Sequence, residues 1–284
     1  MDPSGSRRTV SASGDPVATR RGKLSPAASK NAPMGELGTD ERPWALVTGG
    51  SRGIGRAVAV DLAAHGWNVV VAYLRNDAAA EDAATAVRGH GGRAVVHRLN
   101  VANSAECSEL VRRLETETHA LHGFVHCAAL GAPSSVLATR PGWWRLAWET
   151  HVGALVELVQ QARSLMLPGA GVVALTSLGT HRVMPGYASI AAAKGALETL
   201  VRYLTVELAE ARVNVNALCG GPVDTDSLRS FPFFAELEAE SQRRLPGRIG
   251  RPDDLAPIVR FLLSPEARWI RGQVIVADGG FSLY

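Results

Sequence analysis

Short apolar runs alternate with amphipathic segments along the chain from about residue 43 onward. The runs predict strands near 44–48, 67–73, 93–98, 123–127, 171–176, 213–218 and 273–277. The segments between them predict helices near 53–64, 77–88, 104–120, 142–166, 186–209 and 253–263. Alternation of this kind predicts one α/β domain, a doubly wound parallel seven-stranded sheet flanked by helices, with ligands at the carboxyl ends of the strands.

Residues 1–42 do not share this pattern. Ser, Ala, Pro, Gly and Arg dominate there without apolar periodicity, so we expect a disordered basic arm. The arm lacks the apolar centre of a secretory signal, and Met34 is an alternative start. Its Arg and Ser content is compatible with an organelle transit peptide, although Asp2 and Asp15 weaken that interpretation. Seven of the chain's 30 basic residues and five of its 27 acids lie in the arm. The net charge of +3 therefore comes mostly from the arm and does not indicate nucleic-acid binding.

Composition predicts a globular protein with a sizeable core. The chain has 284 residues, of which 46% are apolar, and this suits one large domain at 43–284. No apolar run approaches the roughly 20 residues that span a bilayer, so we expect a soluble cytoplasmic protein without a membrane partner. Cys107, Cys127 and Cys219 have neither metal-ligand spacing nor an even count, which favours a reducing compartment without disulfides or a bound metal.

The first predicted strand runs into a glycine-rich turn. In WALVTGGSRGIG, Gly49, Gly53 and Gly55 stand between a strand and a helix. Missing side chains there let the backbone approach a pyrophosphate and point the helix N-terminus at it. A second predicted strand, WNVVVAY, ends about twenty residues later, as in a Rossmann-like dinucleotide site.

The end of that second strand indicates which dinucleotide binds. It reads Tyr73-Leu74-Arg75, with no acid to hold the ribose 2′-hydroxyl of NAD. Arg75, joined by Arg52 from the glycine turn, suits a 2′-phosphate, because a planar guanidinium matches phosphate oxygens. The pattern predicts NADPH as the cofactor, with two ordinary surface arginines as the alternative.

Residues 177–194, SLGTHRVMPGYASIAAAK, carry the candidate chemistry. A Pro-Gly pair followed by an Ala-rich run predicts a helix that starts near Pro185. Tyr187 and Lys194 are seven residues apart, so both project from one face, about 10 Å apart along the axis. Ile190, one turn before Lys194, cannot donate a proton. Any acid on this face is therefore Tyr187, unless Tyr187 is a packed aromatic and Lys194 is solvated.

With these motifs in place, residues 43–284 resemble the short-chain dehydrogenase/reductase superfamily. LNV at 99–101 is similar to its adenine-contacting segment, VNALCGGPVDTD at 215–226 to its loop over the nicotinamide, and IRGQVIVADGG at 270–280 to its final strand. The usual tyrosine position, four before the lysine, holds Ile190. A Tyr-x6-Lys spacing instead resembles the NADPH-dependent enoyl-acyl-carrier-protein reductase III type.

The resemblance implies a set of site residues. It makes Tyr187 the proton donor, Lys194 the residue that holds the nicotinamide ribose, and Ser177 the catalytic serine. The cofactor-binding residues that it implies are Gly49, Ser51, Arg52, Gly53, Ile54, Gly55, Arg75, Asn100, Val101, Cys127, Lys194, Gly221, Val223 and Thr225.

Two segments depart from the superfamily pattern. The Asn-Asn-Ala-Gly strand end appears as His126-Cys127-Ala128-Ala129, and His151 stands where a helix often supplies a catalytic asparagine. One imidazole nitrogen cannot both donate and accept as an amide does, which argues against a proton relay through that helix. We expect His151 to be packed or water-bonded and Cys127 to be a small apolar filler.

Residues 225–247, here called the lid segment, are the least patterned part of the domain. Phe231, Phe233 and Phe234 beside a proline, followed by a charged helix, suit a mobile substrate lid with an apolar inner face. A surface helix anchored by aromatics explains the same residues.

Two predicted helices, 142–166 and 186–209, favour self-association. They carry apolar residues on more than one face, so we expect an exposed stripe to remain after they pack on the sheet. Members of the superfamily pair these helices in homodimers and tetramers. The apolar residues are Leu146, Val152, Leu155, Val159, Leu197, Leu200, Val201 and Leu204.

Three functions fit these observations. NADPH-dependent reduction of a 2,3-enoyl thioester of fatty-acid or polyketide type, with hydride going to the β-carbon, accounts for both Tyr187 and Ile190. A carbonyl reductase acting on a 3-oxoacyl or polyketide substrate, with Tyr187 displaced by an irregular helix start, is the second. The third is an NADP-binding scaffold or regulator that has lost catalysis. Whether an acyl carrier protein or coenzyme A carries the acyl group stays open.

Overall fold

A computed structural model describes residues 42–131 and 133–283, so nearly all of the predicted arm, with Met34, lies outside the described residues. The described residues form one parallel sheet with the strand order β3-β2-β1-β4-β5-β6-β7. This confirms the predicted doubly wound seven-stranded sheet. The strands are β1 (Trp44–Thr48), β2 (Asn68–Tyr73), β3 (Ala94–Arg98), β4 (Leu121–His126), β5 (Met166–Thr176), β6 (Asn214–Cys219) and β7 (Val274–Val276).

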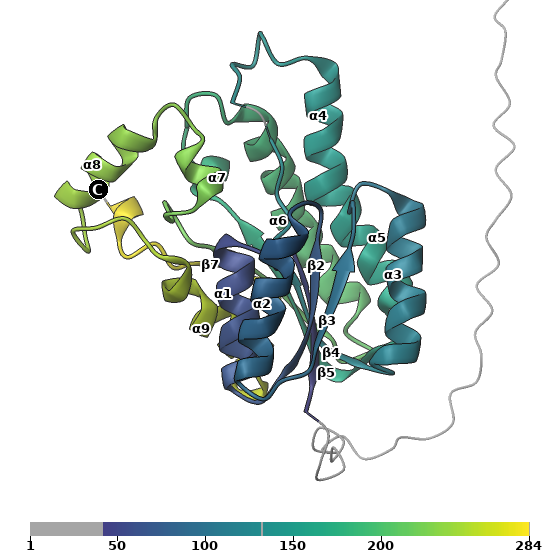
Figure 1. Cartoon of the computed structure of the whole chain (residues 1–284). Helices are drawn as coiled ribbons and strands as arrows, with labels where there is room; N and C mark the ends of the chain where they lie inside the picture. The colour runs from purple at the N-terminus through teal and green to yellow at the C-terminus, as the bar shows by residue number, and fades with distance from the viewer. Residues whose placement is uncertain (1–41, 132, 284) are drawn as a thin grey trace, which may run out of the picture. The chain divides into compact units, whose positions relative to one another are not determined.

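Helices cover both faces of the sheet (Figure 1). Alternate residues of β1 point to opposite faces: Ala45 and Val47 pack with α1, α2 and α9, whereas Trp44 and Leu46 pack with α3, α5 and α6. Each face therefore has its own apolar core. The α-helices are α1 (Gly53–Ala64), α2 (Asp77–Gly89), α3 (Ser104–Glu117), α4 (Pro141–Trp148), α5 (Ala154–Ala162), α6 (Ala188–Glu207), α7 (Asp226–Arg229), α8 (Phe234–Arg243) and α9 (Pro252–Leu263).

The observed helix differs in two respects from the one predicted at 142–166. The observed helix contains a π-helical turn at Glu149–Gly153 between α4 and α5, and it ends at Ala162. The strand β5 consequently begins at Met166, five residues earlier than predicted. The Ala154 N–H bonds to the Glu149 carbonyl, one residue beyond the α-helical partner, which releases the Thr150 carbonyl. Buried His126 from β4 binds that carbonyl through Nε2 at 3.2 Å. This tertiary contact explains the π turn.

The helix predicted at 186–209 starts two residues late. Gly186 has φ of +73°, and the Tyr187 N–H closes a turn onto the Met184 carbonyl at 3.1 Å. Tyr187 is consequently the N-cap residue of α6 and does not lie within the helix.

The strand order reverses between β1 and β4, where a doubly wound sheet opens its ligand crevice. Thr48, at the end of β1, pairs in register with Ala72 of β2 and His126 of β4. The carboxyl ends of these strands are therefore level. Within the described residues, no helix combines the length and the apolar content needed to cross a bilayer.

Candidate active site

A cleft of about 440 Å³ lies at this switch point and is lined by the glycine turn. Gly49 has φ of +69°, and a Cβ there would come within 3.0 Å of the Ala128 nitrogen. A Cβ on Gly55 would come within 2.3 Å of the Gly49 carbonyl oxygen. The first turn of α1 has neither a side-chain cap nor an acidic residue. Its N–H groups therefore suit an anion such as a pyrophosphate.

Arg52 and Arg75 line the same cleft and are exposed. In the described part of the chain, neither guanidinium has an ion-pair or hydrogen-bond partner, so both can bind a phosphate. Asp77, the first acid after β2, accepts a hydrogen bond from the Tyr73 hydroxyl at 3.0 Å and does not line the cleft. The acid that does line the cleft is Asp226, from α7. This end of the cleft fits a 2′-phosphate better than a ribose hydroxyl.

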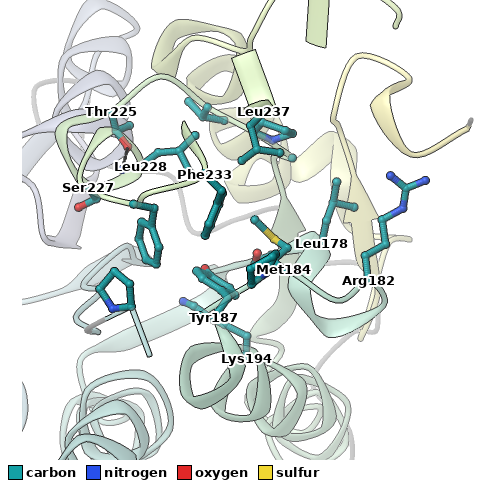
Figure 2. Close-up of a pocket in the computed structure, with 18 of the residues that line it drawn as sticks. Leu178, Arg182, Met184, Tyr187, Lys194, Thr225, Ser227, Leu228, Phe233 and Leu237 are labelled. Carbon is teal, nitrogen blue, oxygen red and sulfur yellow. Dashed lines mark hydrogen bonds between the residues drawn. The ribbon is translucent and has the colours of Figure 1, made fainter. Parts of the chain in front are cut away.

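A larger cleft of about 870 Å³ adjoins the first. Figure 2 shows Tyr187 and Lys194 at the start of α6 on one side of this cleft, with Phe233 and Leu237 from the lid segment on the other. The two clefts share part of their walls, so a dinucleotide in the smaller one can reach a ligand in the larger one. The shared residues are Ile54, Cys127, Ala129, Thr225 and Ser227.

Lys194 is buried, and its Nζ donates to the Leu175 carbonyl at 2.5 Å. Burial lowers the pKa of Lys194 to about 8, an effect that nearby Cys127 and Glu198 oppose. The carboxylate of Glu198, one turn further along α6, accepts hydrogen bonds from Thr176 at 2.6 Å and Thr180 at 3.0 Å. The ammonium group is thus fixed beside the end of β5.

Tyr187 is half-buried, and its phenol lies near the Ser177 side chain. Burial raises the pKa of the Tyr187 phenol, whereas the nearby Ser177 hydroxyl lowers it. The Ser177 oxygen accepts the Gly179 N–H at 3.2 Å, which leaves the serine's own hydrogen for the phenol. Ser177 and Tyr187 therefore lie together at the wall of the larger cleft, which Lys194 also lines.

Every site residue predicted from the sequence lines one of the two clefts. The smaller is lined by Gly49, Ser51, Arg52, Gly53, Ile54, Gly55, Arg75, Asn100, Val101, Cys127 and Thr225. The larger adds Ser177, Tyr187, Lys194, Gly221 and Val223. Ile190 lines neither cleft; it is buried against Gly131.

The lid segment contributes α7, α8 and the turn between them to the larger cleft. Phe231 and Phe233 line the cleft, whereas Phe234 lies against Arg229, whose guanidinium carbon is 5.8 Å from the ring centroid. The mobility of this segment stays a prediction. Sequence reasoning missed the cleft residues Leu178, Met184 and Phe281, because apolar residues at loop positions are their only sequence signal.

Two buried histidines lie behind the clefts. His126 Nδ1 is 3.0 Å from the Thr48 hydroxyl, and burial lowers the pKa of His126 to about 3. His151 is packed, as expected: its Nε2 is 3.1 Å from the Leu130 carbonyl, and burial holds its pKa well below the usual value. Burial also raises the pKa of Cys127 to about 12, so this thiol stays neutral. Among the described residues, no cluster of His, Cys, Asp and Glu suits a metal ion.

Comparison with known proteins identifies the family. The family described as enoyl-(acyl carrier protein) reductase matches residues 49–282. The chain is 35% identical over 259 residues to 1-cyclohexenylcarbonyl-CoA reductase from Streptomyces collinus, covering 89% of this chain and 91% of that one. It is 32% identical to acetoacetyl-CoA reductase from Shinella zoogloeoides, covering 83% and 97%. The chain therefore belongs to the short-chain dehydrogenase/reductase superfamily.

Solved structures agree with this assignment. The angucycline C-6 ketoreductase LanV with bound NADP superposes with a TM-score of 0.79 at 31% identity, over 85% of this chain and 96% of that one. The comparisons confirm the predicted oxidoreductase class and NADPH as the predicted cofactor. The relatives divide between enoyl and carbonyl substrates, so the reaction itself has to be argued from the site.

Proposed function

We propose that the protein is an NADPH-dependent reductase of a 2,3-enoyl thioester of fatty-acid or polyketide type. One observation carries the proposal: Tyr187, seven residues before Lys194, lines the larger cleft, whereas Ile190, four before it, is buried and lines neither cleft. The acid on this wall therefore lies about one helical turn further from Lys194 than in the usual superfamily spacing.

The chemistry of an enoyl thioester gives a reason for the longer spacing. In a ketone, the carbon that accepts hydride also bears the oxygen on which charge develops. In an enoyl thioester, hydride goes to the β-carbon, and charge develops on the thioester oxygen two carbon–carbon bonds away. An acid displaced by about one turn, or about 5 Å, suits the second geometry.

In this proposal Tyr187, Ser177 and Lys194 each have a separate role in the reaction. NADPH, when bound, supplies the hydride. Tyr187 donates a hydrogen bond and then its proton to the developing enolate, and Ser177 orients the phenol. The ammonium of Lys194 favours loss of the phenol proton and holds the nicotinamide ribose. Lys194 is buried, which strengthens its electrostatic interactions relative to those of an exposed ammonium group.

The remaining predicted residues hold the cofactor. Arg52 and Arg75 bind the 2′-phosphate, and the turn from Gly49 to Gly55 with the N-terminus of α1 binds the pyrophosphate. Asn100 and Val101 line the adenine side. Cys127, Gly221, Val223 and Thr225 line the nicotinamide side, where the two clefts meet or adjoin.

The larger cleft supports an acyl substrate. Leu228, Phe233 and Leu237 give it an apolar wall, and 870 Å³ is ample for a short or cyclic acyl chain. The Streptomyces relative is named for a ring whose double bond is conjugated to the thioester carbonyl, itself a 2,3-enoyl group. The carrier is coenzyme A or an acyl carrier protein. The unpaired cysteines of the described residues favour the cytoplasm as the compartment.

A carbonyl reductase is the second candidate. The hydroxyl groups of Ser177 and Tyr187 lie near each other at the larger cleft, where both could bind the oxygen of a 3-oxoacyl thioester. The similarity to acetoacetyl-CoA reductase favours the same activity.

One assay separates the candidates. NADPH oxidation is recorded with crotonyl-CoA and acetoacetyl-CoA side by side, for the unmutated protein and for Tyr187→Phe. We expect faster turnover of crotonyl-CoA and a loss of about 100-fold or more in Tyr187→Phe, with NADPH binding retained. Faster turnover of acetoacetyl-CoA would support the carbonyl reductase. Turnover of neither thioester would support the scaffold, and full activity of Tyr187→Phe would remove Tyr187 from the chemistry.

A further inference from the structure

The ring of Tyr187 is held by residues from outside its own helix. Because Tyr187 is the N-cap of α6, no preceding helical turn restrains its side chain. Gly179, in the turn after β5, lies against one side of the ring: a Cβ there would come within 2.7 Å of Tyr187 Cδ1. The ring therefore sits in space that any other residue at 179 would occupy.

Phe231 of the lid segment also packs on the Tyr187 ring. The two ring centroids are 5.5 Å apart with the planes at 55°, a tilted aromatic pair. Phe231 in turn packs on Phe233, with centroids 5.2 Å apart. The Phe231 N–H donates a hydrogen bond to the Leu228 carbonyl at 3.0 Å, which fixes the Phe231 backbone within the lid segment. The position of the lid segment and the position of the Tyr187 ring are thus linked through one side chain.

We propose that Phe231 is a positioning residue for Tyr187: its ring packs against the phenol and holds the hydroxyl at Ser177, so that the acid is aligned only while the lid segment covers the cleft. The inference rests on the proposed role of Tyr187 as the acid. Ser177 fixes only the hydroxyl end of the side chain, and Gly179 supplies contact without a side chain. Among the described residues, Phe231 is the aromatic side chain whose ring packs on the Tyr187 ring.

Three substitutions in the full chain test the positioning. Phe231→Leu keeps an apolar side chain without a ring, whereas Phe231→Tyr keeps the ring. Phe233→Leu makes the same change elsewhere in the lid segment, at a residue whose ring pairs with Phe231. We expect Phe231→Leu to lower kcat about 10-fold at an unchanged Kd for NADPH, because a small misplacement of an acid is costly. Phe231→Tyr should retain kcat within about 2-fold, and Phe233→Leu should change mainly the KM for the acyl thioester.

A double-substitution cycle shows whether Phe231 acts through Tyr187. In the Tyr187→Phe background no phenol remains to align, so adding Phe231→Leu should lower kcat no further. An equal loss in both backgrounds would mean that Phe231 contacts the substrate instead, and it would overturn the inference. So would an unchanged kcat in Phe231→Leu.

The outcome separates this inference from the proposed function. Full activity of Tyr187→Phe contradicts the function, whereas a large loss in Tyr187→Phe with none in Phe231→Leu contradicts the inference alone. Gly179→Ala provides a second test that does not alter the lid segment. The added methyl group would push the Tyr187 ring away from the turn after β5. We expect it to lower kcat in the Tyr187 background and not in the Tyr187→Phe background; a loss in both would contradict the inference.

Discussion

Ile190 and Gly131 are in direct contact: a Cβ atom on Gly131 would come within 2.2 Å of Ile190 Cδ1. The contact joins the first turn of α6 to the loop that follows β4. Only 5% of Ile190 is exposed. The position where most of the superfamily carries its tyrosine is therefore part of the packing between a helix and a loop.

Ile190→Tyr should be harmful in this setting. A phenol is longer than the isoleucine side chain and has no room beside Gly131, so the loop or the helix must move, at a cost of about 1–3 kcal/mol. We expect a lower Tm and slower reduction of crotonyl-CoA, with weak reduction of acetoacetyl-CoA if the new phenol reaches the cleft. Ile190→Leu conserves volume and is the control. An unchanged Tm together with a wild-type enoyl rate in Ile190→Tyr would contradict this account.

The sequence predicted the sheet because each apolar run has to be buried on both faces, and that requirement is local. The glycine turn could also be predicted from the sequence, because the contact between Gly49 and Gly55 lies within one βα unit. The candidate site followed from the spacing of Tyr187 and Lys194 on one short segment.

Features that depend on contacts between distant segments could not be predicted from the sequence. The π turn exists because His126 takes the Thr150 carbonyl, and these residues are 24 apart in sequence. Likewise, α6 starts late at the turn around Gly186, whose carbonyl accepts the N–H of distant Ser134 at 3.0 Å. The contribution of Phe281 to the cleft comes from the far end of the chain. No periodicity within one segment reports contacts of this kind.

Cofactor choice should depend on Arg75. Each charge-assisted contact to the 2′-phosphate contributes roughly 1.5–3 kcal/mol, so Arg75→Ala should remove most of the preference for NADPH over NADH. Arg52→Ala should act in the same direction. Fluorescence titration with both cofactors gives the two Kd values. Arg56→Ala, an exposed arginine on α1 that does not line the cofactor cleft, is the control. Equal affinity for both cofactors in the unmutated protein would contradict the prediction.

The residues expected to form an association stripe are mostly inside the protomer. Leu155 and Leu197 are fully buried, and Val159, Val201 and Leu204 are buried as well, because α5 and α6 pack directly on the sheet. Val152, in the π turn, is buried against Ala147 of α4 and Ala193 of α6. The large exposed apolar side chains described on these helices are instead Trp148 on α4 and Tyr203 and Val206 on α6, exposed by 54%, 63% and 76%.

We expect these three side chains to be covered by a second copy of the chain, giving a dimer or tetramer. Light scattering at micromolar concentration should report the oligomer for the unmutated protein. The double variant Trp148→Glu/Tyr203→Glu should shift it to the monomer, since two carboxylates would have to be buried. Leu137→Glu, at a fully exposed loop position, controls for added charge. A monomer in the unmutated protein would contradict the prediction.

Stability should fall in mild acid because of His126. Its pKa is about 3 in the folded protein, against about 6.5 in an unfolded chain, so between these values only the unfolded chain binds the proton. The stabilisation is fully present above about pH 6.5 and is lost progressively as the pH falls toward 3. From pH 6.5 to 4.5 the loss at this one site is about 2 kcal/mol, and His151 adds to it in the same direction.

Urea unfolding at pH 4.5, 5.5, 6.5 and 7.5 measures this dependence, and His126→Gln isolates it. The glutamine amide can still donate to the Thr150 carbonyl but does not titrate, so we expect a lower free energy of unfolding at pH 7.5 and a shallower fall in acid. His90→Gln, at an exposed histidine, controls for the loss of one imidazole. Carboxyl groups titrate in every variant, so the difference in slope between variants is the quantity that matters. If His126→Gln and the unmutated protein lose stability in parallel, the pKa of His126 is the same in the folded and unfolded chain, which would contradict this prediction.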